Sequence, residues 1–258
     1  MADANAQIKI TDKGANNAVS LPRRWKLLRN SQIHIAGDNN AITIGENCRF
    51  DDLTIVIKGN NNILRVGDNV LGTGAFSLTG SGTLMIGDNS TIGRCVMTAY
   101  KSTISIGKDC MFAQGLEIRT TDSHPVFDLN TRKRINGDRD VVIEDYVWCG
   151  ARVTVMKGAR IAKSSVVALG SIVTRQFEPF SLIGGYPAKV LRKGVTWTRR
   201  THNEILEEDD IAMMYTADWV PAVEIHETPW WRKFAQIAWK APEWVGRVIP
   251  LASYRRKL

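Results

Sequence analysis

His124 is the residue of this sequence best suited to proton transfer. An imidazole changes its charge near neutral pH, so it can take up or release a proton under ordinary conditions. It lies in the segment TTDSHPVFD, two residues after Asp122 and directly before Pro125. A loop histidine can be exposed without a role, but this one lies in the one long interruption of a regular sequence pattern, which favours function.

The regular pattern is a repeat of six residues. Between residues 140 and 174, two sets of small or branched residues each recur at every sixth position. Neither a helix nor an ordinary strand has this period. It predicts short parallel strands joined by tight turns and stacked as a solenoid, with three hexapeptides in each triangular coil. The first set is Ile143, Cys149, Val155, Ile161, Val167 and Val173, and the second is Val147, Val153, Ala159, Ser165 and Ser171.

A looser form of the repeat precedes this region, beginning near Ser31. Similar tetrads start at residues 44, 66, 86 and 106, and their Gly, Asn and Asp residues suit tight corners, where positive φ is required. The next tetrad-like element starts at Ile143, 37 residues after Ile106. One coil accounts for about 18 of these residues. An insertion of about 19 residues is therefore expected between Arg119 and Arg139.

Composition limits the class of protein without deciding its function. The chain has 258 residues and a net charge of +8, which fits nucleic acid, a phosphate-bearing cofactor, an acidic glycan, lipid headgroups or simply a solvated basic surface. The four cysteines are widely spaced and form no CxxC pair, so we expect buried free thiols in a reducing compartment. A polar N-terminus and the lack of an apolar run near 18 residues predict a cytoplasmic protein.

Several motifs together resemble a known family. The hexapeptide repeats, the TTDSHPVFD loop, VWCGARVTVMKGARI and GGYPAKVLRKG, in this order, resemble the hexapeptide-repeat acyltransferases. Over about residues 31–194 the similarity is greatest with the bacterial polysaccharide O-acetyltransferases of capsule and lipopolysaccharide synthesis. The resemblance implies an all-β solenoid, a left-handed parallel β-helix with an extruded catalytic loop at 119–139. It also implies transfer of an acetyl group from acetyl-CoA to a hydroxyl.

The resemblance assigns the general base to His124, and the chemistry is reasonable. A neutral imidazole can take the proton of a sugar hydroxyl as that oxygen attacks the thioester carbonyl. Asp122, Glu117 or a main-chain carbonyl could orient the other ring nitrogen. Trp148 stands where the family often has an aromatic residue. Its backbone N–H is a candidate donor to the developing oxyanion, while its indole could instead pack on the sugar, on the pantetheine arm or at a subunit seam.

In this family the histidine and the facing aromatic residue come from adjacent subunits of a trimer. The resemblance therefore implies a homotrimer with active sites at the subunit interfaces, and an inactive monomer.

Residues that lack bulk or carry positive charge are expected to hold acetyl-CoA. The small residues suit a close approach of the pantetheine chain, although corner sterics alone could explain them. The segment Gly185–Lys189 resembles a Gly-Asn-Pro-Ala-Lys motif near the adenosine end of CoA, with Tyr186 in place of the Asn. The cations suit phosphates. The predicted set is Gly150, Ala168, Gly170, Arg175, Lys189, Arg192 and Lys193.

The ends of the chain are expected to differ from the solenoid. Residues 1–30 are predicted to form an entry segment that caps the first coil, residues 31–194 the β-helix, and residues 195–258 a Trp-rich, partly helical extension. A short helix is expected at 203–214. The basic segment 229–258 predicts an amphipathic helix, which could contact the inner membrane, border the acceptor groove or simply dock on the solenoid.

Four cations in the insertion indicate an anionic acceptor, such as a glycan containing sialic or uronic acid or a nucleotide-linked sugar. They are Arg132, Lys133, Arg134 and Arg139. We therefore predict an acetyl-CoA-dependent O-acetyltransferase of a bacterial cell-surface glycan, in capsule or lipopolysaccharide, or of its sugar precursor. The alternatives are N-acetylation of a nucleotide-linked amino sugar and a structural or ligand-binding solenoid.

Two other functions are not expected. The γ-type carbonic anhydrases share this coil but need three converging His ligands for their metal. Because His34, His202 and His226 lie in the entry coil and the tail, away from His124, we predict no catalytic metal. No nucleic-acid-binding module accompanies the basic tail, so nucleic acid is not an expected partner.

Overall fold

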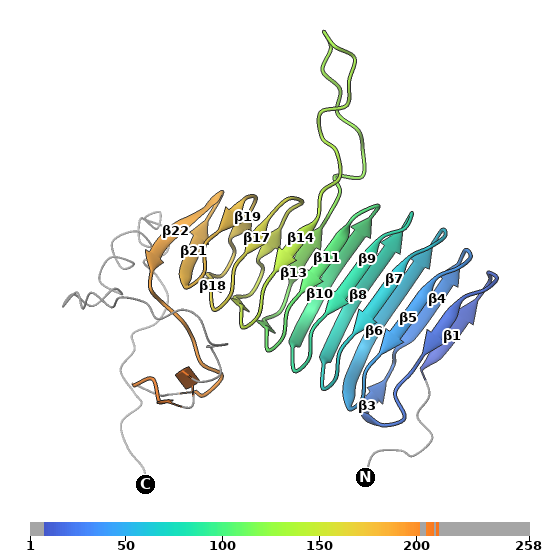
Figure 1. Ribbon diagram of the computed structural model, residues 1–258, viewed down its shortest axis with the longest axis horizontal. Helices are drawn as coiled ribbons and strands as arrows, with labels where there is room; N and C mark the ends of the chain where they lie inside the picture. The colour runs from blue at the N-terminus through green and yellow to red at the C-terminus, as the bar shows by residue number, and fades with distance from the viewer. Residues whose placement is uncertain (1–7, 202–204, 209, 212–258) are drawn as a thin grey trace, which may run out of the picture. The chain divides into compact units, whose positions relative to one another are not determined.

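The computed structural model describes residues 8–201, 205–208, 210 and 211. These residues belong to one compact unit of the chain. They form a solenoid of short strands, β1 to β22, in which each coil stacks on the one before (Figure 1). All strand pairings are parallel except that of the last two strands. The parallel solenoid predicted from the six-residue period is confirmed.

The solenoid has three faces, which we name after their strands in the sixth coil. The β14 face is an eight-stranded sheet with one strand from each coil. Its strands are β2 (Ala18–Ser20), β5 (Ala41–Ile44), β7 (Ile63–Val66), β9 (Thr83–Ile86), β11 (Thr103–Ile106), β14 (Val141–Ile143), β17 (Arg160–Ile161) and β20 (Gln176–Phe177).

The other two faces share three long strands, which turn a corner at register shifts near Asp52, Gly74 and Gly93. The long strands are β6 (Cys48–Lys58), β8 (Leu71–Thr79) and β10 (Thr91–Tyr100). The β13 face adds to their second halves β1 (Lys9–Asp12), β4 (Gln32–Ala36), β13 (Leu116–Arg119), β16 (Thr154–Val155) and β19 (Ile172–Val173). The β15 face adds to their first halves β3 (Trp25–Arg29), β12 (Met111–Phe112), β15 (Trp148–Cys149), β18 (Val166–Val167), β21 (Ser181–Gly185) and β22 (Ala188–Lys193).

The core follows the hexapeptide pattern. Every residue of both predicted sets is at most 1% exposed. Even the two serines are satisfied inside, since Ser171 Oγ donates to Ala168 O at 2.7 Å and Ser165 Oγ accepts from Ser181 N at 3.2 Å. All four cysteines are buried and free, and burial raises the pKa of each thiol, that of Cys48 to about 11. The predicted inward thiols are confirmed.

The corners also match the sequence. Asn47, Asn69, Asn89 and Asp109 have φ angles of 57°, 57°, 58° and 56°. Asn and Asp tolerate this left-handed conformation better than other residues with a side chain. Each corner therefore recurs at the same place in successive coils.

The solenoid begins earlier than the sequence indicated. Lys9 in β1 pairs with Gln32 in β4, and β2 and β3 pair with the next coil as well. Residues 9–29 thus form a complete first coil inside the segment predicted to be a cap. Long corners conceal the repeat here, because equivalent residues such as Ile10 and Ile33 are 23 positions apart.

The C-terminal extension is described only in part. Of the helix expected at 203–214, Glu208, Asp210 and Ile211 are helical, and the remainder is largely outside the described residues. The expected amphipathic segment 229–258 lies wholly outside them. Among the described residues, no helix combines the length and apolar character needed to cross a membrane.

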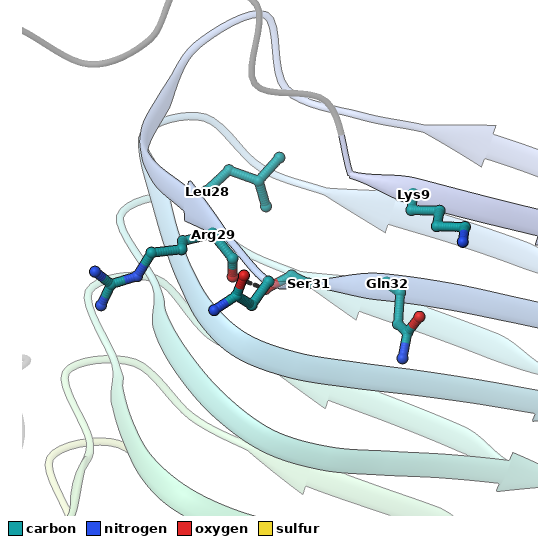
Figure 2. Close-up of a pocket in the computed structure, with 6 residues that line it drawn as sticks. Lys9, Leu28, Arg29, Ser31 and Gln32 are labelled. Carbon is teal, nitrogen blue, oxygen red and sulfur yellow. Dashed lines mark hydrogen bonds between the residues drawn. The ribbon is translucent and has the colours of Figure 1, made fainter.

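A cavity of about 300 Å³ lies at the N-terminal end of the solenoid (Figure 2). It contains none of the predicted site residues, and its walls belong to the first and second coils, whereas the long insertion leaves the sixth. The cavity is therefore separate from the predicted active site. The lining residues are Lys9, Leu28, Arg29, Asn30, Ser31 and Gln32.

Candidate active site

The predicted insertion is an arm, residues 120–140, that leaves the solenoid between β13 and β14 and projects away from it (Figure 1). Its two limbs pair in antiparallel fashion. At the base, Arg139 N donates to Thr120 O at 3.1 Å, and farther out Ile135 N donates to Val126 O at 2.9 Å. The arm lies between Arg119, the last residue of β13, and Val141, the first residue of β14.

His124 is exposed on the outgoing limb, near the base of the arm. Its main chain is held on both sides: His124 N donates to Asp122 O at 2.8 Å, and Asn136 Nδ2 donates to His124 O at 2.8 Å. Among the described residues, the imidazole itself has no hydrogen-bond partner. The backbone is therefore anchored, while both ring nitrogens remain available to another group.

A group of three polar side chains fastens the base of the arm, and we call it the arm-base network: Asp122, Asn136 and Lys157. Lys157 Nζ donates to Asp122 Oδ2 at 2.6 Å and to Asn136 O at 2.8 Å. Asn136 Nδ2 also donates to Asp122 Oδ2, at 2.9 Å, and Asn136 Oδ1 accepts from Val126 N at 2.7 Å. The Lys157 side chain is only 11% exposed. The network links both limbs of the arm to the seventh coil.

The network changes the interpretation of Asp122. Its carboxylate is bonded to Lys157 and Asn136, and the bond from Lys157 is the main cause that holds the pKa of Asp122 below its ordinary value. The second candidate to orient His124, Glu117, forms an ion pair with Arg119 at 3.3 Å. Neither carboxylate contacts the His124 ring within the described chain. Asp122 acts on the backbone around His124 rather than on its ring.

Sequence reasoning missed Asn136 and Lys157. A signal for Lys157 was present, because Ile118 pairs with Val155 in the next coil. That register places Lys157 directly beside Thr120, where the arm begins. Asn136 carried no such signal, since its partners depend on how the two limbs of the arm pair.

The four arm cations lie in different surroundings. Arg132 and Lys133 are exposed in the outer part of the arm, and Arg134 pairs with Asp138 at 3.2 Å. The Arg139 side chain instead lies over Gly158, with its Nη1 3.4 Å from the place where a Cβ of that glycine would be. No ion pair of Arg139 is found among the described residues, so this guanidinium can take an anion near the arm base.

Trp148 lies on β15 with its side chain outward and 36% exposed. Its backbone N–H donates to Ser165 O of the next coil at 3.0 Å. That N–H is consumed by the ladder between coils, so the expectation that it could bind an oxyanion is wrong. The indole remains as the part of Trp148 that can meet a ligand.

A single chain keeps His124 and Trp148 apart. The arm leaves the corner between the β13 and β14 faces, whereas Trp148 lies on the β15 face, across the triangle from that corner. No contact joins the two side chains within the described residues.

This architecture has close counterparts among known proteins. No family model matches the sequence. The chain is 37% identical over 202 residues to a polysialic acid O-acetyltransferase from Neisseria meningitidis, a match that spans 77% of this chain and 94% of that protein. Two crystal structures are also similar. The polySia-specific acetyltransferase NeuO has a TM-score of 0.77 at 30% identity over 80% of this chain and 96% of that one. The polysialic acid O-acetyltransferase OatWY has a TM-score of 0.77 at 35% identity over 80% and 99%.

The chain belongs to this family of hexapeptide-repeat O-acetyltransferases. The predicted superfamily, the left-handed β-helix and the acyltransferase activity are confirmed. The comparisons support an enzyme over the alternative of a solenoid without catalytic function.

In this O-acetyltransferase, most of the residues predicted to hold the acyl donor lie on neighbouring coils of the β15 face. Gly150 N donates to Val167 O and Ala168 N donates to Ile183 O, while Gly184 pairs with Lys189 of β22. Arg192 and Lys193 follow on the same exposed strand. Arg175 lies apart, after β19 at the arm's corner, where its guanidinium covers the Phe177 ring at 5.3 Å. A single chain therefore gathers all of the predicted set except Arg175 near one end of this face.

The two glycines of the predicted set, Gly150 and Gly170, are favoured for different structural reasons. A Cβ on Gly150 would lie 2.8 Å from Leu169 N in the next coil, so the stacking of the coils demands glycine there whether or not a ligand binds. Gly170 has a φ of 71° and nothing within 4 Å of a built Cβ, so its backbone conformation alone favours glycine. Steric crowding therefore accounts for Gly150, and the positive φ of the corner accounts for Gly170.

No group of three or more His, Cys, Asp or Glu side chains in the described part of the O-acetyltransferase is arranged to hold a metal ion.

Proposed function

We propose that this O-acetyltransferase transfers the acetyl group of acetyl-CoA to a hydroxyl of an anionic capsule glycan built from sialic acid, with His124 as general base. The observation that carries the proposal is the placement of His124. Its backbone is anchored by Asn136 and Asp122 at the base of a projecting arm, while its imidazole is exposed and unpaired within the described chain. A base held in this way can meet an acceptor that arrives from solvent.

His124 moves one proton in the reaction. It takes the proton of the acceptor hydroxyl as that oxygen bonds to the acetyl carbon, and it returns the proton to sulfur when the thioester C–S bond breaks. The products are an acetyl ester and the free thiol of CoA. No metal or redox step is needed for this balance.

The positive charge at the foot of the arm favours an anionic acceptor. Arg139 lies over Gly158 at the foot of the arm without a carboxylate partner among the described residues, and the chain as a whole carries a charge of +8. A guanidinium binds a carboxylate through two parallel hydrogen bonds. The similarity to polysialic acid O-acetyltransferases supports a polymer with one carboxylate on each sugar.

Acetyl-CoA binds along the β15 face. Trp148 offers its exposed indole to the pantetheine arm, and the small residue Ala168 follows Val166 and Val167 on the neighbouring strand β18. Lys189, Arg192 and Lys193 on β22 are exposed cations suited to the phosphates at the far end of the cofactor.

The active site is completed by a second subunit of a homotrimer. The separation of His124 and Trp148 within one chain supports this arrangement, and so do the exposed apolar side chains of the arm. Such side chains stabilise a protein when another surface covers them. They are Val126 (51% exposed), Phe127 (55%), Leu129 (91%) and Ile135 (63%). We place the enzyme in the cytoplasm, where its donor is made, and contact of 229–258 with the inner membrane remains a prediction.

The test uses the purified full chain and radiolabelled acetyl-CoA. The acceptors are polysialic acid, a neutral polysaccharide and a nucleotide-linked amino sugar. We expect alkali-labile label on polysialic acid alone, because esters are cleaved by mild base and amides are not. His124→Ala and His124→Gln should abolish transfer while keeping the thermal unfolding midpoint. Label found only as an amide, or an active His124→Ala variant, would refute the proposal.

A further inference from the structure

The segment after β22, residues 195–200, which we call the strap, lies against the β15 face. Val195 N donates to Phe180 O at 3.0 Å, where the strap begins. Trp197, on the outer side of the solenoid, is nevertheless only 6% exposed. Its ring stacks on Tyr146 at 4.7 Å, and its Nε1 donates to Tyr146 O at 2.8 Å. Together with Val166, these two rings form a buried cluster separate from the main core.

Arg199 fastens the strap to two neighbouring coils, the fourth and the fifth. Its guanidinium donates to Cys110 O at 2.7 Å, to Asp109 O and Asn89 O at 3.2 Å each, and to Thr91 Oγ1 at 3.1 Å. It also lies over the Trp197 ring, 5.7 Å from the centroid. Three interactions therefore hold Trp197: ring stacking on Tyr146, a hydrogen bond to the Tyr146 carbonyl and the Arg199 guanidinium over its ring.

Trp197 in turn contacts Trp148. The two ring centroids are 6.1 Å apart with the planes tilted by 42°, an arrangement that aromatic pairs favour. Backbone hydrogen bonds between neighbouring coils fix the main chain of Trp148. Its side chain points outward, and those bonds do not determine its χ angles. Among the described residues, Trp197 is the aromatic ring that packs against this indole.

We propose that Trp197 is a positioning residue, which sets the orientation of the Trp148 indole for acetyl transfer. The inference rests on the proposed function, in which Trp148 meets the acyl donor. The strap thereby makes part of the C-terminal extension a component of the active site. Without the Trp197 ring, the Trp148 indole samples other rotamers, and the acyl donor binds in fewer productive poses.

The kinetic test compares Trp197→Leu with a matched control, Trp25→Leu. Trp25 lies on the same face in the first coil, where it packs on the Phe50 ring at 5.3 Å. Trp197→Leu should lower kcat about tenfold to a hundredfold, the size of loss that a small misplacement produces, with the KM for glycan changed less than about twofold. Trp197→Phe should restore most of kcat. Trp25→Leu should lower only the unfolding midpoint.

A double variant separates positioning from general packing. If Trp197 acts through Trp148, Trp197→Leu should cost nothing further in kcat when it is added to Trp148→Leu. An equal additional loss in that background would overturn the proposal, as would a similar loss of kcat in Trp25→Leu.

A second measurement does not depend on catalysis. In protein labelled with 5-fluorotryptophan, the ¹⁹F resonance of Trp148 is assigned by its disappearance in Trp148→Phe. This resonance should shift or broaden in Trp197→Leu and stay unchanged in Trp25→Leu. An unmoved resonance would refute the inference even if the enzyme is active. If the wild type transfers no acetyl group but the resonance moves, the proposed function fails while the contact stands.

Discussion

Replacing Lys157 with Met should uncouple the catalytic arm from the solenoid. The change removes two hydrogen bonds, to Asp122 Oδ2 and to Asn136 O, and keeps most of the side-chain volume. A charged hydrogen bond contributes about 1.5–3 kcal/mol when buried. Because the Asp122 side chain is 32% exposed, solvent screens part of this. We expect a loss of about 1–2 kcal/mol in unfolding free energy.

The effect on catalysis should exceed the effect on stability. Asn136 holds the carbonyl of His124, and Lys157 holds Asn136, so the loss allows the imidazole to move relative to the acceptor. A displacement of about 1 Å can cost a hundredfold in rate. We expect kcat to fall about tenfold to a hundredfold. Lys157→Arg, which keeps the charge, should lose less.

The assay measures kcat, both KM values and urea-induced unfolding for Lys157→Met and for Lys58→Met. Lys58 is the exposed last residue of β6 on the β13 face, so Lys58→Met controls for the loss of a positive charge. Asp122 has a lowered pKa, so its contribution to stability is present above the unfolded pKa of about 3.9 and is lost as pH falls through the folded value. The stability gap between wild type and Lys157→Met should therefore narrow below about pH 4, and the part that comes from the bond to Asn136 O should remain. A Lys157→Met variant with wild-type kcat, or with a gap that keeps its full size at lower pH, would refute this reasoning.

Three further outcomes are expected. Asn136→Ala should reduce kcat about tenfold at nearly constant KM in steady-state assays, because the His124 carbonyl loses its donor. Gly150→Ala should lower the thermal unfolding midpoint by several degrees in calorimetry, since its Cβ would lie 2.8 Å from Leu169 N; an unchanged midpoint would contradict the close stacking. Arg139→Gln should raise the KM for polysialic acid about threefold to tenfold and leave the KM for acetyl-CoA unchanged; equal changes in both would argue against its role toward the acceptor.

Much of this fold was predictable because its determinants are local. A residue such as Val155 is buried for the same reason as Val173 one coil later: both occupy the inward position of a hexapeptide. The arm was also predictable, because an insertion interrupts the strict six-residue period. The first coil was missed because its corners lengthen the interval between equivalent residues and hide that period.

The site could be predicted from the sequence only where the chemistry of a side chain was itself the signal. His124 could be singled out as an imidazole inside the interruption. The backbone N–H of Trp148 could not be excluded as an oxyanion donor from sequence, because its partner, Ser165 O, is reached only by stacking one coil on the next. For the carboxylate of Asp122, the register of the repeat indicated that Lys157 lies nearby, but only the structure shows the bond between these residues, which are 35 positions apart.

The sequence by itself determined the period, hence the coil, its buried positions and the one place where the chain departs from it. The tertiary structure alone decided which groups meet at that place. Trp197 lies on Tyr146, 51 residues away, and Asn136 holds His124 across the arm. A repeat specifies the contacts between equivalent positions of neighbouring coils, but the strap and the arm lie outside the repeat. The residues that the strap and the arm contact depend on the path of the chain in three dimensions. The six-residue period does not determine that path.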